Sequence, residues 1–229
     1  MGQRNVPHPW YWWMVVLVTL IGSELQGDTP VPEERQQTEA ETTGRTVEPI
    51  TPIPPNVSLD AQRVTLGERL FGDARLSGDS KRSCAECHPL DKGGMDAKPR
   101  AIATDGAARL RNVPTIYNVG YNFAFNWDGA TTTLEEHAAR LLANPAVMNA
   151  KWPDLLAKLR ADARYPALFD AAYADGLTQN NVLNALATFQ RSLNTPNAPL
   201  DRYLRGERDA LDAQQLRGYR LFKSYGCIA

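Results

Sequence analysis

Two cysteines and one histidine in a single short segment point to the chemistry of this chain. The segment reads Cys84-Ala85-Glu86-Cys87-His88. Two thiols separated by two residues can each add to one vinyl group of the same haem, and the adjacent histidine can then ligate the iron. The spacing therefore predicts one covalent c-type haem, with Cys84 and Cys87 as its thioether anchors and His88 as the proximal iron ligand.

Three other interpretations of the two thiols remain open: half of a zinc site, a thioredoxin-like dithiol, and chance. A zinc site needs a second pair of ligands, and only Cys227 and His137 remain outside the motif and the N-terminal segment. A redox dithiol usually follows a strand, whereas a polar, glycine-containing loop precedes Cys84. The order of the motif favours haem over all three.

The elements that must position this motif are predicted to be helices. Apolar residues recur three or four positions apart after residue 58, and no alternating strand pattern of useful length is present. Helices are expected at 58–71 before Gly72, 133–144, 152–161, 167–173, 182–193, 200–204 and 213–225. Residues 73–130 are rich in glycine, proline, asparagine and aspartate and are expected to be loop. A loop of that length needs a reason, and a cofactor for it to surround is one. The predicted fold class is all-α, a cytochrome c-like haem domain with long loops.

Composition excludes several classes of protein. The 25 basic and 26 acidic residues give a formal net charge of −1, so a basic nucleic-acid-binding face is not expected. No run of 18 apolar residues occurs, which excludes a polytopic membrane protein. Three cysteines are too few for a disulfide scaffold.

The N-terminal part is predicted to be an export segment followed by a linker. Residues 10–22 are apolar except for Thr19, and as a helix they would reach about 20 Å, short of the roughly 30 Å of a bilayer core. We interpret residues 1–27 as a signal peptide, with an uncleaved membrane anchor as the alternative. Residues 28–57 are rich in proline, threonine and glutamate and are expected to be a flexible linker. The expected location is the periplasm, with anchoring to the inner membrane left open.

The last residues resemble the beginning of another haem motif. The chain ends Gly226-Cys227-Ile228-Ala229, one Cys-His pair short of a second site. We therefore expect residues 58–210 to form an N-terminal haem domain and residues 211–229 to be the first helix of a truncated second cytochrome c domain. As it stands, Cys227 cannot complete a haem site.

Beyond the haem motif, a series of short motifs runs in order along the chain from about Val64 to Ala229. They are Leu66–Phe71, Asp73–Ser77, Gly93-Gly94, Arg111–Thr115, Trp127-Asp128-Gly129, Leu134–Glu136, Ala185–Arg191 and Pro199–Leu204. Each motif is weak alone, but their order and spacing together are specific. In these features the chain resembles the bacterial di-haem cytochrome c peroxidase/MauG family.

The resemblance implies a fold and a division of labour. Members have two domains with one c-type haem each: the N-terminal haem reduces hydrogen peroxide, and the C-terminal haem receives electrons from a small donor protein. Trp127 matches a tryptophan that lies between the two haems, although an ordinary core aromatic is the alternative. Asn112 matches an asparagine that helps to bind calcium between the domains.

The chain also departs from the family pattern on the distal side of the N-terminal haem. The family's distal histidine corresponds to a position near Thr104, and no histidine lies in residues 89–129. The family's acid/base glutamate corresponds to Val147, which cannot transfer a proton. His137 takes a position that resembles a family glutamine, so it is a distal base, a sixth iron ligand, or a packed or surface residue. Met95 and Met148 are rival iron ligands.

The functional expectation is a periplasmic haem oxidoreductase of this family, in a truncated or weakly active form. It would reduce hydrogen peroxide, or use it to oxidise a protein, with electrons from a small cytochrome c or cupredoxin. Haem c and, through Asn112, calcium are the expected cofactors. The alternatives are a mono-haem electron-transfer or haem-binding protein without turnover, and a non-functional fragment. A homodimer is left open, no nucleic-acid partner is expected, and contact with a membrane is expected only through an N-terminal anchor.

Overall fold

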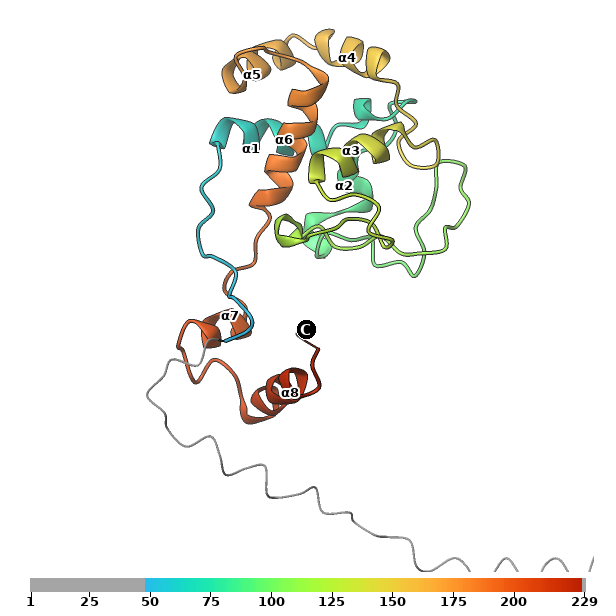
Figure 1. The fold of residues 1–229 in the computed structure, drawn as a ribbon. Coiled ribbons are helices and arrows are strands. Elements are labelled where there is room, and N and C mark those ends of the chain that lie inside the picture. The colour runs from blue at the N-terminus through green and yellow to red at the C-terminus, as the bar shows by residue number, and fades with distance from the viewer. Residues whose placement is uncertain (1–47, 228–229) are drawn as a thin grey trace, which may run out of the picture. The chain divides into compact units, whose positions relative to one another are not determined.

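The computed structural model describes residues 48–227, and within them the regular structure is helical (Figure 1). The α-helices are α1 (Ala61–Phe71), α2 (Cys84–Cys87), α3 (Leu134–Ala143), α4 (Trp152–Arg160), α5 (Arg164–Ala172), α6 (Gln179–Ser192), α7 (Pro199–Leu204) and α8 (Ala213–Ser224). Three 3-10 turns, η2 (Ala74–Leu76), η3 (Leu90–Lys92) and η4 (Val119–Tyr121), lie in the loop region. Residues 48–227 contain isolated β-bridges but no β-strand. The predicted all-α class is therefore confirmed.

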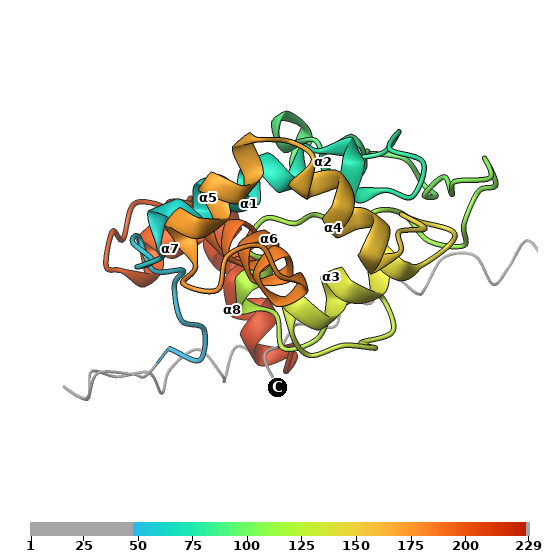
Figure 2. The same cartoon turned by 90° about the horizontal axis from the view of Figure 1, so that it is seen from above.

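Helix α6 is the centre of the packing, between α1 on one side and α3 on the other (Figures 1 and 2). Leu66 and Leu70 of α1 meet Val182 and Leu186 of α6 in the buried core. The two helices approach so closely that a Cβ at Gly67 would lie 2.0 Å from the carbonyl oxygen of Ala185 on α6. Only glycine allows this contact, because that distance is well inside the van der Waals limit.

Helix starts lie within three residues of those expected from the sequence; α1 begins at Ala61 rather than at 58, and α6 at Gln179 rather than at 182. Thr133 and Thr178 accept hydrogen bonds from backbone amides in the first turns of α3 and α6, as N-cap residues do. Helix α5, expected from residue 167, begins at Arg164 instead. Pro166 lies in its first turn, where a backbone N–H has no intrahelical partner, so the proline does not interrupt the helix.

An ion cluster joins the segment after α1 to the turn between α4 and α5. Arg75 forms ion pairs with Asp73 and Asp162, both at 2.6 Å. Burial acts to raise the pKa of Asp73, but hydrogen bonds from Arg75 and Tyr165 outweigh it and the pKa is lowered. Hydrogen bonds from Arg164 and then Arg75 hold the pKa of Asp162 far below its usual range. Both carboxylates are therefore charged in the folded protein at neutral pH.

Residues 48–57 make specific contacts with α7 and α8. The Tyr219 hydroxyl donates to a Glu48 carboxylate oxygen at 2.6 Å, and Lys223 pairs with the same carboxylate at 3.2 Å. The Ile53 amide donates to Asp201 at 2.8 Å. This differs from the flexible linker expected over 28–57, because Glu48 and Ile53 near its end have hydrogen-bonded partners that composition does not reveal. Residues 28–47, and the signal peptide or anchor expected over 1–27, lie outside the described residues.

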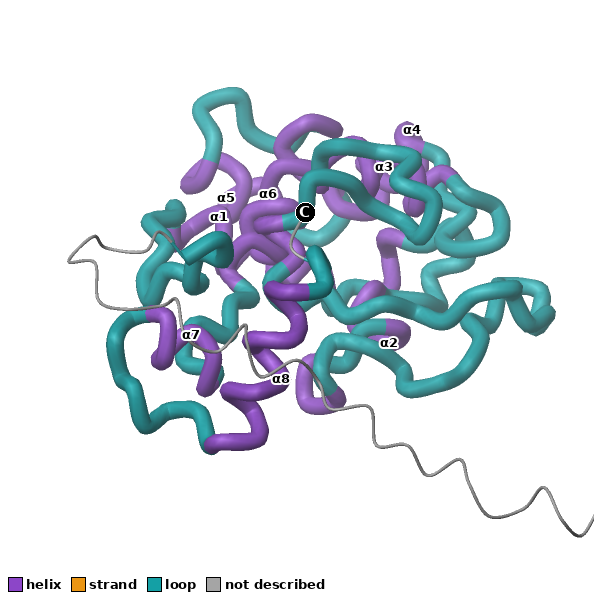
Figure 3. The backbone as a smooth tube through the Cα atoms, turned by 60° about the horizontal axis from the view of Figure 1, so that its bottom comes forward, coloured by secondary structure: helices purple, strands orange, loops and turns teal. Residues whose placement is uncertain are grey.

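The long loop region connects α1 to α3 and contains α2 (Figure 3). Loop and short 3-10 turns fill almost all of residues 73–130, as predicted. Across residues 48–227, no helix has both the length and the apolar character needed to cross a bilayer.

Candidate functional site

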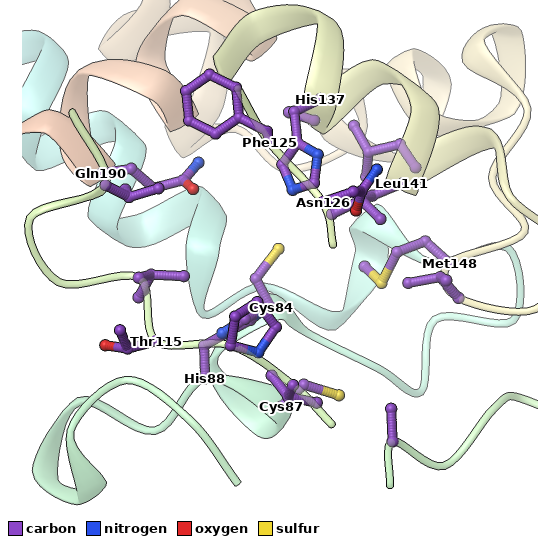
Figure 4. A pocket seen from close by; sticks show the side chains of 18 of the residues that line it. Cys84, Cys87, His88, Thr115, Phe125, Asn126, His137, Leu141, Met148 and Gln190 are labelled. Carbon is purple, nitrogen blue, oxygen red and sulfur yellow. The ribbon is translucent and has the colours of Figure 1, made fainter. Parts of the chain in front are cut away.

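The loops, α2, α3 and α6 enclose a cavity of about 440 Å³ (Figure 4). Cys84, Cys87 and His88 all line it. Most of the other lining side chains are apolar, among them Phe71, Val113, Ile116, Leu142 and Leu186. The volume lies within the range of about 300–1,000 Å³ that is usual for small-molecule and cofactor sites.

One short helical turn brings the motif to this cavity. Helix α2 consists of the four residues Cys84–Cys87, and the His88 amide donates to the Cys84 carbonyl at 2.9 Å. Residues three and four apart on a helix share a face, so both thiols and the imidazole are presented together. The C-x-x-C-H spacing therefore acts as the sequence predicts.

The proximal histidine is held by the backbone of the following loop. His88 Nδ1 lies 3.0 Å from the carbonyl oxygen of Gly94. A carbonyl can only accept, so Nδ1 donates and Nε2 keeps the lone pair that binds a metal. Burial lowers the pKa of His88 and is opposed by its hydrogen bonds to backbone carbonyls. Gly94 has a φ of +70°, and a Cβ there would lie 3.0 Å from Ile116 Cγ1, so this position requires glycine.

The environment of the thiols disfavours the zinc and dithiol interpretations. Burial, and then the neighbouring Cys87, raises the pKa of Cys84 to about 12, and burial raises the pKa of Cys87. Zinc ligation and disulfide exchange both use thiolates, which raised pKa values oppose. Within residues 48–227 there is no cluster of three or more histidine, cysteine or acidic residues that could hold a metal ion.

His137 faces the cavity from the side opposite His88, with Cys84 between them (Figure 4). Thr133 caps α3 so that Leu134, Ala138 and Leu142 enter the core. The neighbouring stripe of the helix, His137 and Leu141, then lines the cavity. The His137 ring therefore points into the cavity (Figure 4).

The His137 ring is fixed by stacking rather than by hydrogen bonds. The Phe125 ring stacks on it with a centroid distance of 5.7 Å. Its Nδ1 is buried and has no hydrogen-bond partner among the described residues. Burial, and then the proximity of His88 and Arg140, lowers the pKa of His137. The imidazole is therefore neutral near pH 7 and able to accept a proton.

Several polar cavity residues escape prediction from the sequence, among them Asn126 and Gln190. Asn126 precedes the predicted Trp127 and lines the cavity, and Gln190 reaches it from α6. The Gln190 amide donates to the Leu186 carbonyl at 3.2 Å within its own helix. In the sequence, Gln190 could have been identified only from its position in a buried helical pattern. Asn126 could have been identified only from its proximity to Trp127.

The structure separates the remaining distal candidates. Val147 and Met148 both line the cavity, and Met148 is buried. Met95 and Thr104 are exposed and do not line it, and the Thr104 hydroxyl donates to the Pro145 carbonyl instead. Of the two rival methionine ligands, only Met148 is therefore in reach of the cavity.

Trp127 and Asn112 lie together at the edge of the cavity. The Trp127 indole N–H donates to the Asn112 carbonyl at 3.1 Å, and both residues line the cavity. Trp127 is 57% exposed, so the core-aromatic alternative is wrong. The Asn112 amide donates only to the adjacent Val113 carbonyl, at 3.3 Å, and calcium binding there stays a prediction. Cys227 is exposed after α8 and does not line the cavity.

The residues present fit a covalent haem. The cavity has two thiols and a neutral imidazole on one side, mostly apolar walls, and on the other side a buried imidazole nitrogen without a partner among residues 48–227. A c-type haem needs this donor set and a water-excluding shell.

Comparison with known proteins agrees with this site. Residues 61–209 match the family model described as di-haem cytochrome c peroxidase. The chain is 42% identical over 181 residues to the cytochrome c peroxidase Ccp of Escherichia coli, covering 79% of this chain and 39% of that protein. It is 34% identical to the methylamine utilization protein MauG of Methylophilus methylotrophus, covering 78% of this chain and 54% of that protein.

A solved structure agrees as well. The chain is similar to a MauG-like protein associated with microbial copper homeostasis, with a TM-score of 0.65 and 30% identity, covering 80% of this chain and 54% of the other. The chain spans about half the length, or less, of the relatives it matches.

Proposed function

Because this chain belongs to the di-haem cytochrome c peroxidase family, we propose that it is a c-type haem oxidoreductase that reduces hydrogen peroxide. The electrons come from a small donor protein, a cytochrome c or a cupredoxin, and the reaction takes place in the periplasm. A protein side chain is the alternative electron source, as the resemblance to the di-haem cytochrome c peroxidase/MauG family implies.

One observation carries the proposal: His137 and His88 face one cavity from opposite sides, and Cys84 and Cys87, the proposed thioether anchors, line the same cavity (Figure 4). His88 is oriented for metal ligation by the Gly94 carbonyl. His137 is neutral, buried and without a hydrogen-bond partner among the described residues. This arrangement provides a proximal ligand on one side and a proton acceptor on the other.

The chain's own residues then have separate tasks in peroxide reduction. When bound, the haem supplies an iron centre for peroxide and a path for electrons. His137 accepts the proton from the near oxygen of hydrogen peroxide and returns it to the far oxygen, which leaves as water. Leu141 and Val147 exclude bulk water from this transfer. Overall, one peroxide, two electrons and two protons give two water molecules.

A second candidate function has one observation in its favour. Met148 is 5% exposed and lines the cavity, and a thioether is a common sixth ligand of c-type haem in electron-transfer proteins. Val147, beside it, offers no proton-transferring group. A mono-haem electron-transfer protein with Met148 on the iron would therefore carry the same motif but would not react with peroxide.

The two functions differ in one assay. The chain is exported together with haem-ligation machinery, purified, and mixed with a reduced cytochrome c or cupredoxin, with and without hydrogen peroxide. A peroxidase oxidises the donor only when peroxide is present, and a Cys84→Ser/Cys87→Ser variant loses this activity. Donor oxidation that is independent of peroxide supports the electron-transfer candidate, and no donor oxidation under either condition contradicts both.

A further inference from the structure

Asn126 lines the cavity but takes no part in the roles described so far for the haem motif and His137. Its backbone has a φ of +64°, a region that asparagine tolerates better than most residues. The residue is exposed and lines the cavity, and its side chain makes no hydrogen bond with any residue in 48–227. An amide with two donors and one acceptor thus faces the same space as the imidazole of His137.

The backbone holds Asn126 next to the distal histidine. Phe125, the preceding residue, stacks on the His137 ring at 5.7 Å. The Phe125 amide donates to the Thr131 carbonyl at 2.8 Å, and the Gly129 amide donates to the Asn126 carbonyl at 3.2 Å. These bonds close a tight turn with Asn126 at its start. The amide is therefore presented to the cavity by a constrained loop and not by a free one.

The other side chains next to His137 are apolar, whereas Gln190, which also lines the cavity, donates its amide to the Leu186 carbonyl (Figure 4). Leu141, Val147 and Met148 line it next to His137 and cannot donate a hydrogen bond to a ligand. Figure 4 shows Asn126 and His137 on the same side of the cavity, opposite His88. A small ligand in this space thus has two polar partners of different kinds, one proton acceptor and one amide donor.

We propose that Asn126 is a distal hydrogen-bond donor that, together with His137, binds the outer atoms of a small ligand of the iron, such as azide or peroxide. For peroxide, this rests on the function proposed above. As the O–O bond breaks, His137 moves the proton from the near to the far oxygen, and the Asn126 N–H donates to the far oxygen, which leaves as water. The two electrons come from the small donor protein.

Azide binding to the ferric, haem-loaded chain tests the amide without turnover. Asn126→Gly removes the amide and keeps the positive φ without strain. We expect the azide dissociation constant to rise about 3- to 10-fold, the usual effect of losing one hydrogen bond. Asn126→Asp keeps the shape but replaces the donors by a carboxylate, and should weaken azide binding at least as much. Asn149→Gly is the matched control, because Asn149 also has a positive φ, +49°, but does not line the cavity.

Carbon monoxide bound to the ferrous protein gives a second readout. A distal donor polarises the ligand and lowers its stretching frequency, so Asn126→Gly should raise that frequency and Asn149→Gly should leave it unchanged. Parent-like azide affinity and carbon monoxide frequency in both Asn126 variants would overturn the proposal. Weaker azide binding in a protein that does not reduce peroxide would support the donor role and contradict the proposed function alone.

Discussion

Replacement of His137 by glutamine should slow the reaction of the haem-loaded chain with hydrogen peroxide. Glutamine keeps a polar side chain on α3 but cannot accept and return a proton. A distal acid/base group is generally worth about 10²–10⁴ in rate. The structure places His137 at the lower end of that range, since its Nδ1 has no partner among residues 48–227 to stabilise the protonated ring. We therefore expect a loss of about 100-fold in the second-order rate constant.

Stopped-flow spectroscopy of the ferric protein with excess peroxide measures this rate. The pH dependence of this rate gives a further test. Burial, and then the proximity of His88 and Arg140, lowers the pKa of His137, because each of them disfavours the protonated ring. Because the pKa is lowered, the parent rate should stay flat through neutral pH and fall only in acid, at a pH lower than the ordinary histidine value of about 6.5. The His137→Gln variant should lack that fall.

Glu136→Gln is the matched control, because Glu136 is the neighbouring residue on α3, is exposed and does not line the cavity. It should keep the rate and the pH profile of the parent. A His137→Gln protein with the parent rate and profile would refute the base role. A parent that is low-spin and a variant that becomes high-spin and binds cyanide faster would instead identify His137 as the sixth iron ligand.

Three further outcomes follow from the packing. Gly67→Ala should destabilise the fold by about 1–3 kcal/mol through overpacking. Gly72→Ala is the control and should not destabilise it, because no atom lies closer than 3.9 Å to the added Cβ. Thermal unfolding compares the two variants, and an equal melting temperature for both would contradict the close α1–α6 contact. Gly94→Ala should disturb the hydrogen bond between His88 Nδ1 and the Gly94 carbonyl and so reduce the fraction of chain that retains ligated haem. The absorption spectrum measures this fraction, and parent-like retention would contradict the proposed role of the Gly94 carbonyl in orienting His88. Arg75→Gln should destabilise the protein at pH 7, because Arg75 bridges two aspartates whose pKa values are lowered. The free energy of unfolding should also drop less in the variant than in the parent as the pH falls below about 4. Urea unfolding at both pH values measures this drop, and an equal drop in the two proteins would contradict the role of Arg75.

The helical fold could be predicted in large part from local signals. Helical periodicity and threonine N-caps identify α3 and α6, and both begin close to where the sequence predicts. Helix α5 starts earlier than predicted because a proline is tolerated in a first turn. The contacts of residues 48–57 with α7 and α8 could not be predicted, since they join positions about 150 or more residues apart and proline-rich composition indicates only an extended chain.

The proximal side of the candidate site could be predicted from the sequence, whereas most of the distal side could not. The proximal residues Cys84, Cys87 and His88 form a contiguous motif, so their spacing alone predicts their geometry. The distal residues come from separate elements, and only His137 had a residue type that indicates chemistry. Asn126 owes its place to a positive φ and to a turn closed by backbone hydrogen bonds within residues 125–131, and the sequence pattern predicts neither.

Covalent haem attachment is the central claim, and peptide mass spectrometry of the haem-loaded chain tests it most directly. After export with haem-ligation machinery and proteolysis, one haem should be found on the peptide that contains Cys84 and Cys87, and none on the peptide that contains Cys227. The attachment should survive denaturation and acid extraction, and Cys84→Ala should abolish the stable double linkage. A haem that is extracted under these conditions, leaving both motif cysteines as free thiols, would contradict the account.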